Sequence, residues 1–100
     1  MIVEFTLAAE FELDDAVTYY NAVKPGLGLE FVDEVAAAVA RIVEFPDAWQ
    51  RLKGGVRRCQ LHRFEYGLVY RVHGKVATVY AVMHLKRRPG YWRERLKAPS

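Results

Sequence analysis

Residues 66–84, YGLVYRVHGKVATVYAVMH, decide the fold because they contain two strands and the turn that joins them. In the first strand, apolar side chains recur at every second position, the period of a strand with one buried face, at Tyr66, Leu68, Tyr70 and Val72. Gly74 lies in the short VHGK connection and supplies the permissive backbone of a tight hairpin turn. This stretch therefore predicts an antiparallel hairpin.

Residues 76–84 are apolar on both faces, which predicts that this strand lies at the centre of the sheet. Simple alternation places two sets of side chains on opposite faces: Val76, Thr78, Tyr80 and Val82, and Ala77, Val79, Ala81 and Met83. His84 ends the strand, where its side chain could face the open side of the sheet.

Two further strands are predicted on the N-terminal side of the hairpin. Residues 56–64, VRRCQLHRF, alternate from Val56, and residues 1–7, MIVEFTL, place Val3, Phe5 and Leu7 on one face. Residues 46–55, PDAWQRLKGG, read as irregular because they contain a proline and end in two glycines.

Two helices are predicted between these strands. Residues 8–23 form the first, and Thr6 is placed to cap it. Residues 29–45 form the second and carry an apolar seam at steps of four and three residues, at Phe31, Val35, Ala38, Ile42 and Phe45. The KPGLG link is short, so the helices should form an antiparallel hairpin.

The whole chain, residues 1–100, is predicted to be one α+β domain with the element order β-α-α-β-β-β. The helical hairpin covers one face of an antiparallel sheet and leaves the other face open. A short helix is possible at the C-terminal end.

Composition favours a compact protein, because hydrophobic residues make up 52% of the chain. The longest apolar runs reach only about seven residues, against roughly 20 for a membrane span. The N-terminus is acidic and alternating, unlike a secretory signal, so we expect a cytoplasmic protein without a membrane partner. Cys59 is the only cysteine; it is either a buried core thiol or, beside the arginines, a reactive one.

Charge divides the chain into two halves. Residues 1–50 hold 2 basic and 10 acidic residues and carry −8, whereas residues 51–100 hold 13 basic and 2 acidic residues and carry +11. The basic half predicts a polyanionic or acidic partner, unless the arginines pair with the acidic helices of the same chain. The side chains that we expect at this surface are Arg57, Arg58, Arg63, Arg71, Lys86, Arg87, Arg88, Trp92 and Arg95.

Residues 84–95, HLKRRPGYWRER, place a histidine and two aromatic residues among five basic ones. Tyr91 could stack on an unpaired base, whereas Trp92 is expected mainly to anchor the segment by packing. RNA cleavage without a metal needs a base, an acid and cations around the phosphate, and His84, Tyr91 and the arginines are candidates. His62 is a weaker candidate, and no metal or cofactor is expected because Cys59 and His62 should point to opposite faces of a strand.

Several stretches in order resemble the RelE/ParE superfamily of type II toxin–antitoxin toxins, also described as plasmid stabilisation proteins. These stretches are DDAVTYYNAVKPGLGLEFVDEV, FPDAW, GGVRRCQLHRFEYGLVYRV and VYAVMHLKRRPGYWRER. The resemblance covers nearly the whole chain and implies a toxin that inhibits bacterial growth when free of its antitoxin. It also implies an acidic cognate antitoxin that wraps the toxin in a hetero-oligomer.

The resemblance leaves two targets open. RelE-like members are endoribonucleases that cleave mRNA on the ribosome, and here Arg58, Arg63, Arg87 and Tyr91 occupy similar positions, with His84 as a candidate acid or base. ParE-like members inhibit DNA gyrase and need no active site. The chain lacks the lysine-rich sheet of the best-known ribosomal nucleases, and its RFEYGLVYRV and PGYW stretches are more similar to the ParE-like branch. A third hypothesis is a non-toxic, stand-alone nucleic-acid-binding module.

Overall fold

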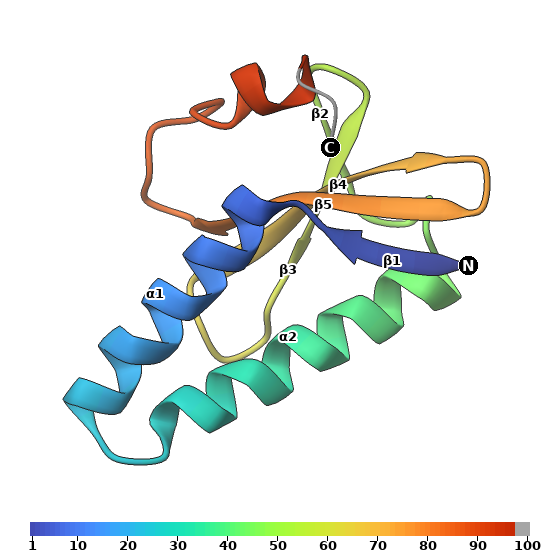
Figure 1. Ribbon diagram of the computed structural model, residues 1–100. Coiled ribbons are helices and arrows are strands. Elements are labelled where there is room, and N and C mark those ends of the chain that lie inside the picture. The colour runs from blue at the N-terminus through green and yellow to red at the C-terminus, as the bar shows by residue number, and fades with distance from the viewer. Residues whose placement is uncertain (98–100) are drawn as a thin grey trace.

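The computed structural model describes residues 1–97, which form a helical hairpin, a five-stranded sheet and a short C-terminal helix. In chain order the elements are β1 Ile2–Phe5, α1 Leu7–Val23, α2 Leu27–Glu44, β2 Gln50–Leu52, β3 Val56–Gln60, β4 Tyr66–His73, β5 Val76–His84 and the 3₁₀ helix η1 Arg93–Leu96. Figure 1 shows α1 and α2 on one side of the sheet and the C-terminal segment, residues 85–97, on the other. The predicted α+β class, helical hairpin and C-terminal helix are confirmed.

The sheet has the strand order β1-β5-β4-β3-β2, so β5 lies inside the sheet, as predicted. It is mixed rather than antiparallel throughout, because β1 pairs in parallel with β5 from Ile2 opposite Val76 to Phe5 opposite Val79. Strand β2 is an addition to the predicted order. It lies in the segment that reads as irregular and contributes only three residues, too few for alternation to be recognised.

The helical hairpin forms as the sequence predicts, with one exception. Thr6 caps α1, because its hydroxyl oxygen accepts a hydrogen bond from the backbone N–H of Ala9 at 3.2 Å. The first four seam positions of α2, from Phe31 to Ile42, are buried against the sheet. Phe45 is 56% exposed, because the helix ends at Glu44 and the backbone leaves the helical path before the seam continues.

A β-bulge in β5 changes the faces that simple alternation predicts. Val69 of β4 pairs with Ala81, but the next residue, Tyr70, pairs with Val79, so Tyr80 is an extra residue in β5. Beyond Tyr80 the two faces exchange. Val82 packs with the helix-side core, whereas Ala81 and Met83 pack on the opposite face, which contradicts the predicted assignment of these three residues.

The face away from the helices has its own smaller core. Val56, Val69, Ala81 and Met83 pack there around Trp92, which is only 3% exposed. The prediction that Trp92 anchors the C-terminal segment by packing is therefore confirmed, and part of the face that we expect to be open is covered by residues 91–96. No helix among residues 1–97 is long and apolar enough to cross a bilayer.

Candidate functional site

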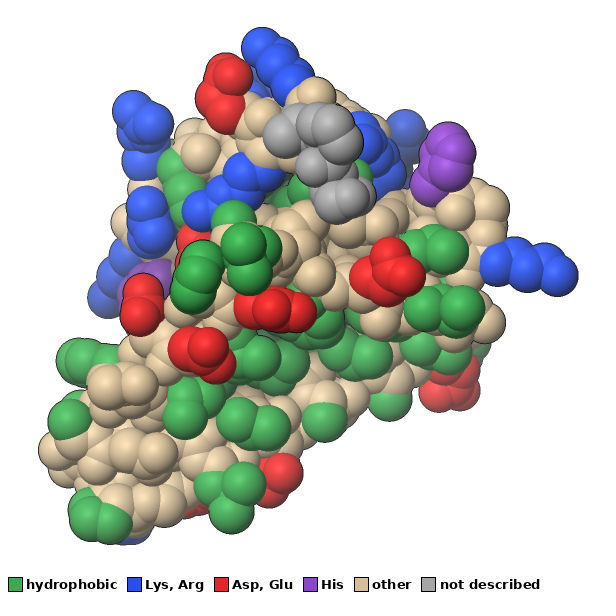
Figure 2. Space-filling model, in the orientation of Figure 1, with side chains coloured by type: hydrophobic (Ala, Val, Ile, Leu, Met, Phe, Trp, Pro, Cys, Tyr) green, Lys and Arg blue, Asp and Glu red, His purple; other side chains and the backbone are tan. Residues whose placement is uncertain are grey.

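Basic and acidic side chains gather in different parts of the molecule. Figure 2 shows most Lys and Arg side chains in the upper half of the view, around the C-terminal segment and the strand ends. Most Asp and Glu side chains lie lower, over the helices. The charge division of the sequence is thus also a division in space, with the helices acidic and the C-terminal segment basic.

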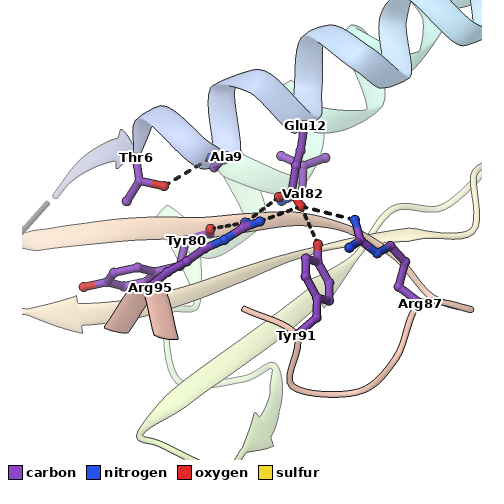
Figure 3. Close-up of polar contacts among 8 residues, drawn as sticks. All are labelled: Thr6, Ala9, Glu12, Tyr80, Val82, Arg87, Tyr91 and Arg95. Carbon is purple, nitrogen blue, oxygen red and sulfur yellow. Dashed lines mark hydrogen bonds and ion pairs between the residues drawn. The ribbon is translucent and has the colours of Figure 1, made fainter. Parts of the chain in front are cut away.

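A carboxylate that is mostly covered by the protein joins these two regions (Figure 3). Glu12 of α1 accepts hydrogen bonds from Tyr91 Oη at 2.6 Å, from the backbone N–H of Val82 at 3.0 Å, and from both terminal nitrogens of Arg95. Arg87 Nη1 lies 3.8 Å from the same carboxylate. We call these side chains, Glu12, Arg87, Tyr91 and Arg95, the Glu12 cluster. They fasten the C-terminal segment to α1 and to the central strand.

Sequence reasoning missed Glu12, although the sequence carries a signal for it. Glu12 lies three residues after Ala9 and four before Ala16, which are the two buried positions of α1. An acidic residue on the buried stripe of a helix needs a partner, because an unpaired buried charge is costly. The side chain is only 14% exposed, and the cluster supplies its partners.

The contacts of Tyr91 hold its side chain within the Glu12 cluster. Burial and the hydrogen bond to Glu12 raise the pKa of its phenol well above its usual range, so the hydroxyl stays protonated. The guanidinium of Arg87 stacks on the ring at 3.8 Å from its centre, and that of Arg95 lies at 5.1 Å. Tyr91 therefore has both a polar and two cationic partners within its own chain.

His84 faces the helices, not the open side of the sheet where we expect it. The bulge at Tyr80 turns the end of β5 over, so the His84 ring meets the edge of Tyr66 with centres 4.9 Å apart. Its Nδ1 accepts a hydrogen bond from the backbone N–H of Lys86 at 3.1 Å. The ring lines a cavity of about 290 Å³ together with Glu12 and Arg87.

Most of the other predicted surface residues pair within the chain. Arg63 makes an exposed salt bridge with Glu30 of α2 at 2.7 Å, on the helical side of the molecule. Arg57 donates to the backbone oxygen of Trp49, and Arg71 donates to the hydroxyl of Tyr80 and lies over its ring. Lys86 pairs weakly with Glu65, and Arg88 is exposed.

Arg58 lies on the face away from the helices and is separate from the Glu12 cluster. Its Nη2 donates to Gln50 Oε1 at 2.8 Å, and its side chain lines a cavity beside Trp92. The structure therefore brings His84, Arg87, Tyr91 and Arg95 together around Glu12, brings Arg58 to Trp92, and leaves Arg63 apart from both groups.

Cys59 is fully buried, which agrees with the core interpretation of this residue. Its thiol lies 3.9 Å from the backbone oxygen of Ala38, and burial raises the pKa of the thiol. Residues 1–97 contain no group of three or more His, Cys, Asp or Glu side chains that could hold a metal ion.

Comparisons with known proteins agree with this architecture. The family model described as the ParE toxin of the type II toxin–antitoxin system, parDE, matches residues 3–89. A solved structure described as a chromosomal ParDE TA system from P. aeruginosa matches with a TM-score of 0.76 at 23% sequence identity. That match covers 86% of this chain and 97% of the other, and it shows a shared fold. No curated protein matches the sequence.

Proposed function

Because the chain belongs to the ParE toxin family of type II toxin–antitoxin systems, we propose that it stops bacterial growth by binding DNA gyrase. In this proposal the toxin acts by contact and not by cleaving RNA. A cognate acidic antitoxin holds it inactive in a hetero-oligomer.

One observation carries the choice of gyrase: the residues that a nuclease would need are dispersed or occupied. RNA cleavage requires an acid and a base at opposite sides of one phosphate, with cations beside it. Here the Tyr91 hydroxyl donates to a carboxylate, and His84 lies on the helical side of the sheet. Arg58 lines a cavity on the other side. Arg87 and Arg95 already pair with Glu12, so a phosphate would have to compete with this carboxylate for them.

The distribution of charge supports the acidic antitoxin. The second half of the chain carries +11, and most Lys and Arg side chains in Figure 2 lie around the C-terminal segment and the strand ends. Among residues 1–97, Arg63, Arg87 and Arg95 pair with carboxylates of the helices, and the other cations of this half repel one another unless an acidic partner neutralises them. Complementary charge also speeds the encounter of two partners, which favours rapid capture of newly made toxin.

The test is induced expression without antitoxin, with DNA synthesis and protein synthesis followed by separate pulse-labelling. We expect DNA synthesis to stop first. We also expect the purified chain to inhibit supercoiling by gyrase. The variants His84→Ala and Tyr91→Phe should inhibit as the parent does, provided that circular dichroism shows them folded.

Two results would contradict the proposal. An early stop in protein synthesis that is lost in either variant would assign the chain to mRNA cleavage on the ribosome. A folded product that has no effect on growth, but binds nucleic acid with a steep salt dependence, would identify a stand-alone binding module.

A further inference from the structure

The face of the sheet away from the helices holds a cavity of about 180 Å³ under the C-terminal segment. Leu52, Met83 and Trp92 give it an apolar floor, and Lys53, Arg58 and Arg93 surround it with positive charge. Among residues 1–97, no acidic side chain lines it. The cavity is therefore suited to a group that is partly apolar and carries a negative charge.

Two buried hydrogen-bond donors at this cavity lack an acceptor among residues 1–97. They are Nε1 of Trp92 and Nε of Arg58, and both residues line the cavity. Burying a donor without an acceptor costs about 1–3 kcal/mol, so native proteins contain few of them. The other tryptophan, Trp49, does find an acceptor, the backbone oxygen of Arg41 at 3.3 Å. Both atoms are almost inaccessible in this structure, so a ligand that brings the missing acceptor reaches them only when the side chains around the cavity shift.

The backbone is shaped to hold the two arginines at this cavity. A Cβ at Gly67 would lie 2.8 Å from Cγ of Arg58, and a Cβ at Gly90 would lie 2.8 Å from Nε of Arg93. Each arginine therefore lies directly against a glycine, at a distance that any side chain there would prevent.

The size of the cavity selects the class of ligand. Small-molecule sites usually have about 300–1,000 Å³, so this cavity is too small for a nucleotide but sufficient for one amino-acid side chain. A glutamate fits its chemistry, because its methylene groups can contact Met83 and Leu52 while its carboxylate accepts from the two donors. A phosphate would leave the apolar floor uncovered.

We propose that this cavity binds a glutamate side chain of the acidic antitoxin and that Trp92 Nε1 and Arg58 Nε donate to its carboxylate. The proposal rests on the proposed function for the identity of the partner, but not for the chemistry of the site. It makes Trp92 a hydrogen-bond donor to the partner as well as an anchor of the C-terminal segment.

The indole N–H resonances give a direct test, because the protein has only two tryptophans. The full chain is titrated with a capped glutamate, N-acetyl-glutamate N-methylamide, and Trp49→Phe assigns the two resonances. We expect the Trp92 resonance to move with saturation while that of Trp49 stays in place. A single side chain binds with a Kd on the order of millimolar or weaker, so the titration extends to about 100 mM. Capped glutamine, which is uncharged, should produce little movement.

Two variants with a matched control test the geometry. Gly67→Ala keeps every charge but displaces Arg58, and Arg58→Gln removes its guanidinium. Each should weaken binding of capped glutamate by about tenfold, the effect of one hydrogen bond to a charged group. Arg51→Gln makes the same charge change at an exposed residue of β2, the strand next to β3. This variant should leave binding unchanged. If Gly67→Ala does not fold, Arg58→Gln carries the test alone.

Three results would overturn the proposal: no movement of the Trp92 resonance at the highest concentration, equal binding in Arg58→Gln, or stronger binding of inorganic phosphate than of capped glutamate. The last result would assign the cavity to a nucleic-acid phosphate. None of these measurements depends on toxicity. A chain that binds capped glutamate but does not inhibit gyrase would refute only the proposed function.

Discussion

Arg95 binds Glu12 through two parallel hydrogen bonds, from Nη1 to Oε1 at 2.8 Å and from Nη2 to Oε2 at 3.1 Å. The two residues are 83 positions apart in the chain. Arg95 Nη1 also donates to the backbone oxygen of Tyr80 at 3.0 Å, so one guanidinium links α1, the bulge of β5 and the C-terminal segment. Bidentate geometry of this kind is among the stronger polar contacts in proteins.

Glu12→Gln should lower the free energy of unfolding by about 2–3 kcal/mol, because it leaves a half-buried Arg95 without its negative partner. Urea denaturation at neutral pH measures the effect. Glu10→Gln makes the same change on the exposed face of α1 and should stay within about 0.5 kcal/mol of the parent. Equal losses in the two variants would show that the Glu12 cluster contributes no specific stability.

Tyr91→Phe should lower the free energy of unfolding by about 1.5 kcal/mol, the contribution of a hydrogen bond to a charged group. Its ring still packs under Arg87, and Glu12 keeps Arg95 as a partner. Thermal denaturation measures this loss, with Tyr19→Phe, an exposed tyrosine of α1, as the control. A Tyr91→Phe variant as stable as the control would contradict the geometry of the cluster.

Stability should fall as the pH rises above about 10. Burial raises the pKa of the Tyr70 phenol to about 12, and burial with the Glu12 hydrogen bond also raises the pKa of Tyr91. Unfolded tyrosine titrates near about 10. A pKa raised by folding means that the stabilisation is complete below the unfolded pKa and is lost as the pH rises toward the folded pKa.

Urea unfolding at a series of pH values from about 8 to 12 measures this slope, which spans the unfolded and folded pKa values of Tyr70. In Tyr70→Phe the slope should be smaller, because one of the phenols whose pKa is raised by folding is gone. An equal slope in Tyr70→Phe and the parent would show that Tyr70 does not contribute to the alkaline loss.

Cys59 should resist thiol reagents as long as the protein is folded. The thiol is fully buried, and its raised pKa disfavours the reactive thiolate. A chromogenic disulfide such as Ellman's reagent should therefore react in guanidinium chloride, but only at the rate of unfolding in native buffer. Fast reaction of the native protein would instead support the reactive-cysteine interpretation.

The sequence predicts the elements that depend on local pattern. The cap at Thr6 and the seam from Phe31 to Ile42 follow from residue type and spacing, which act over one or two turns of helix. The central position of β5 follows from its apolar residues on both faces. Each of these features is encoded in a continuous stretch of sequence.

The features that the sequence does not predict depend on pairing between distant segments. The parallel pairing of β1 depends on both β1 and β5, and the sequence of either strand alone does not indicate it. The extra residue at Tyr80 exchanges the faces of β5, and alternation has no signal for it because both faces are apolar. That exchange moves His84 away from Arg58 and separates the candidate site into parts. The role of Glu12 is missed for the same reason, because its partners Tyr91 and Arg95 lie about 80 positions later in the chain.

The pairing of the first strand with the last has a consequence for biosynthesis. The ribosome releases the N-terminal end first, yet β1 needs β5, and Glu12 needs residues 82–95. A nascent chain that lacks these residues leaves a strand unpaired and a carboxylate without its arginine. The native fold can therefore form only after residues 82–95 have been made, so a nascent chain that stops before them is not yet a toxin.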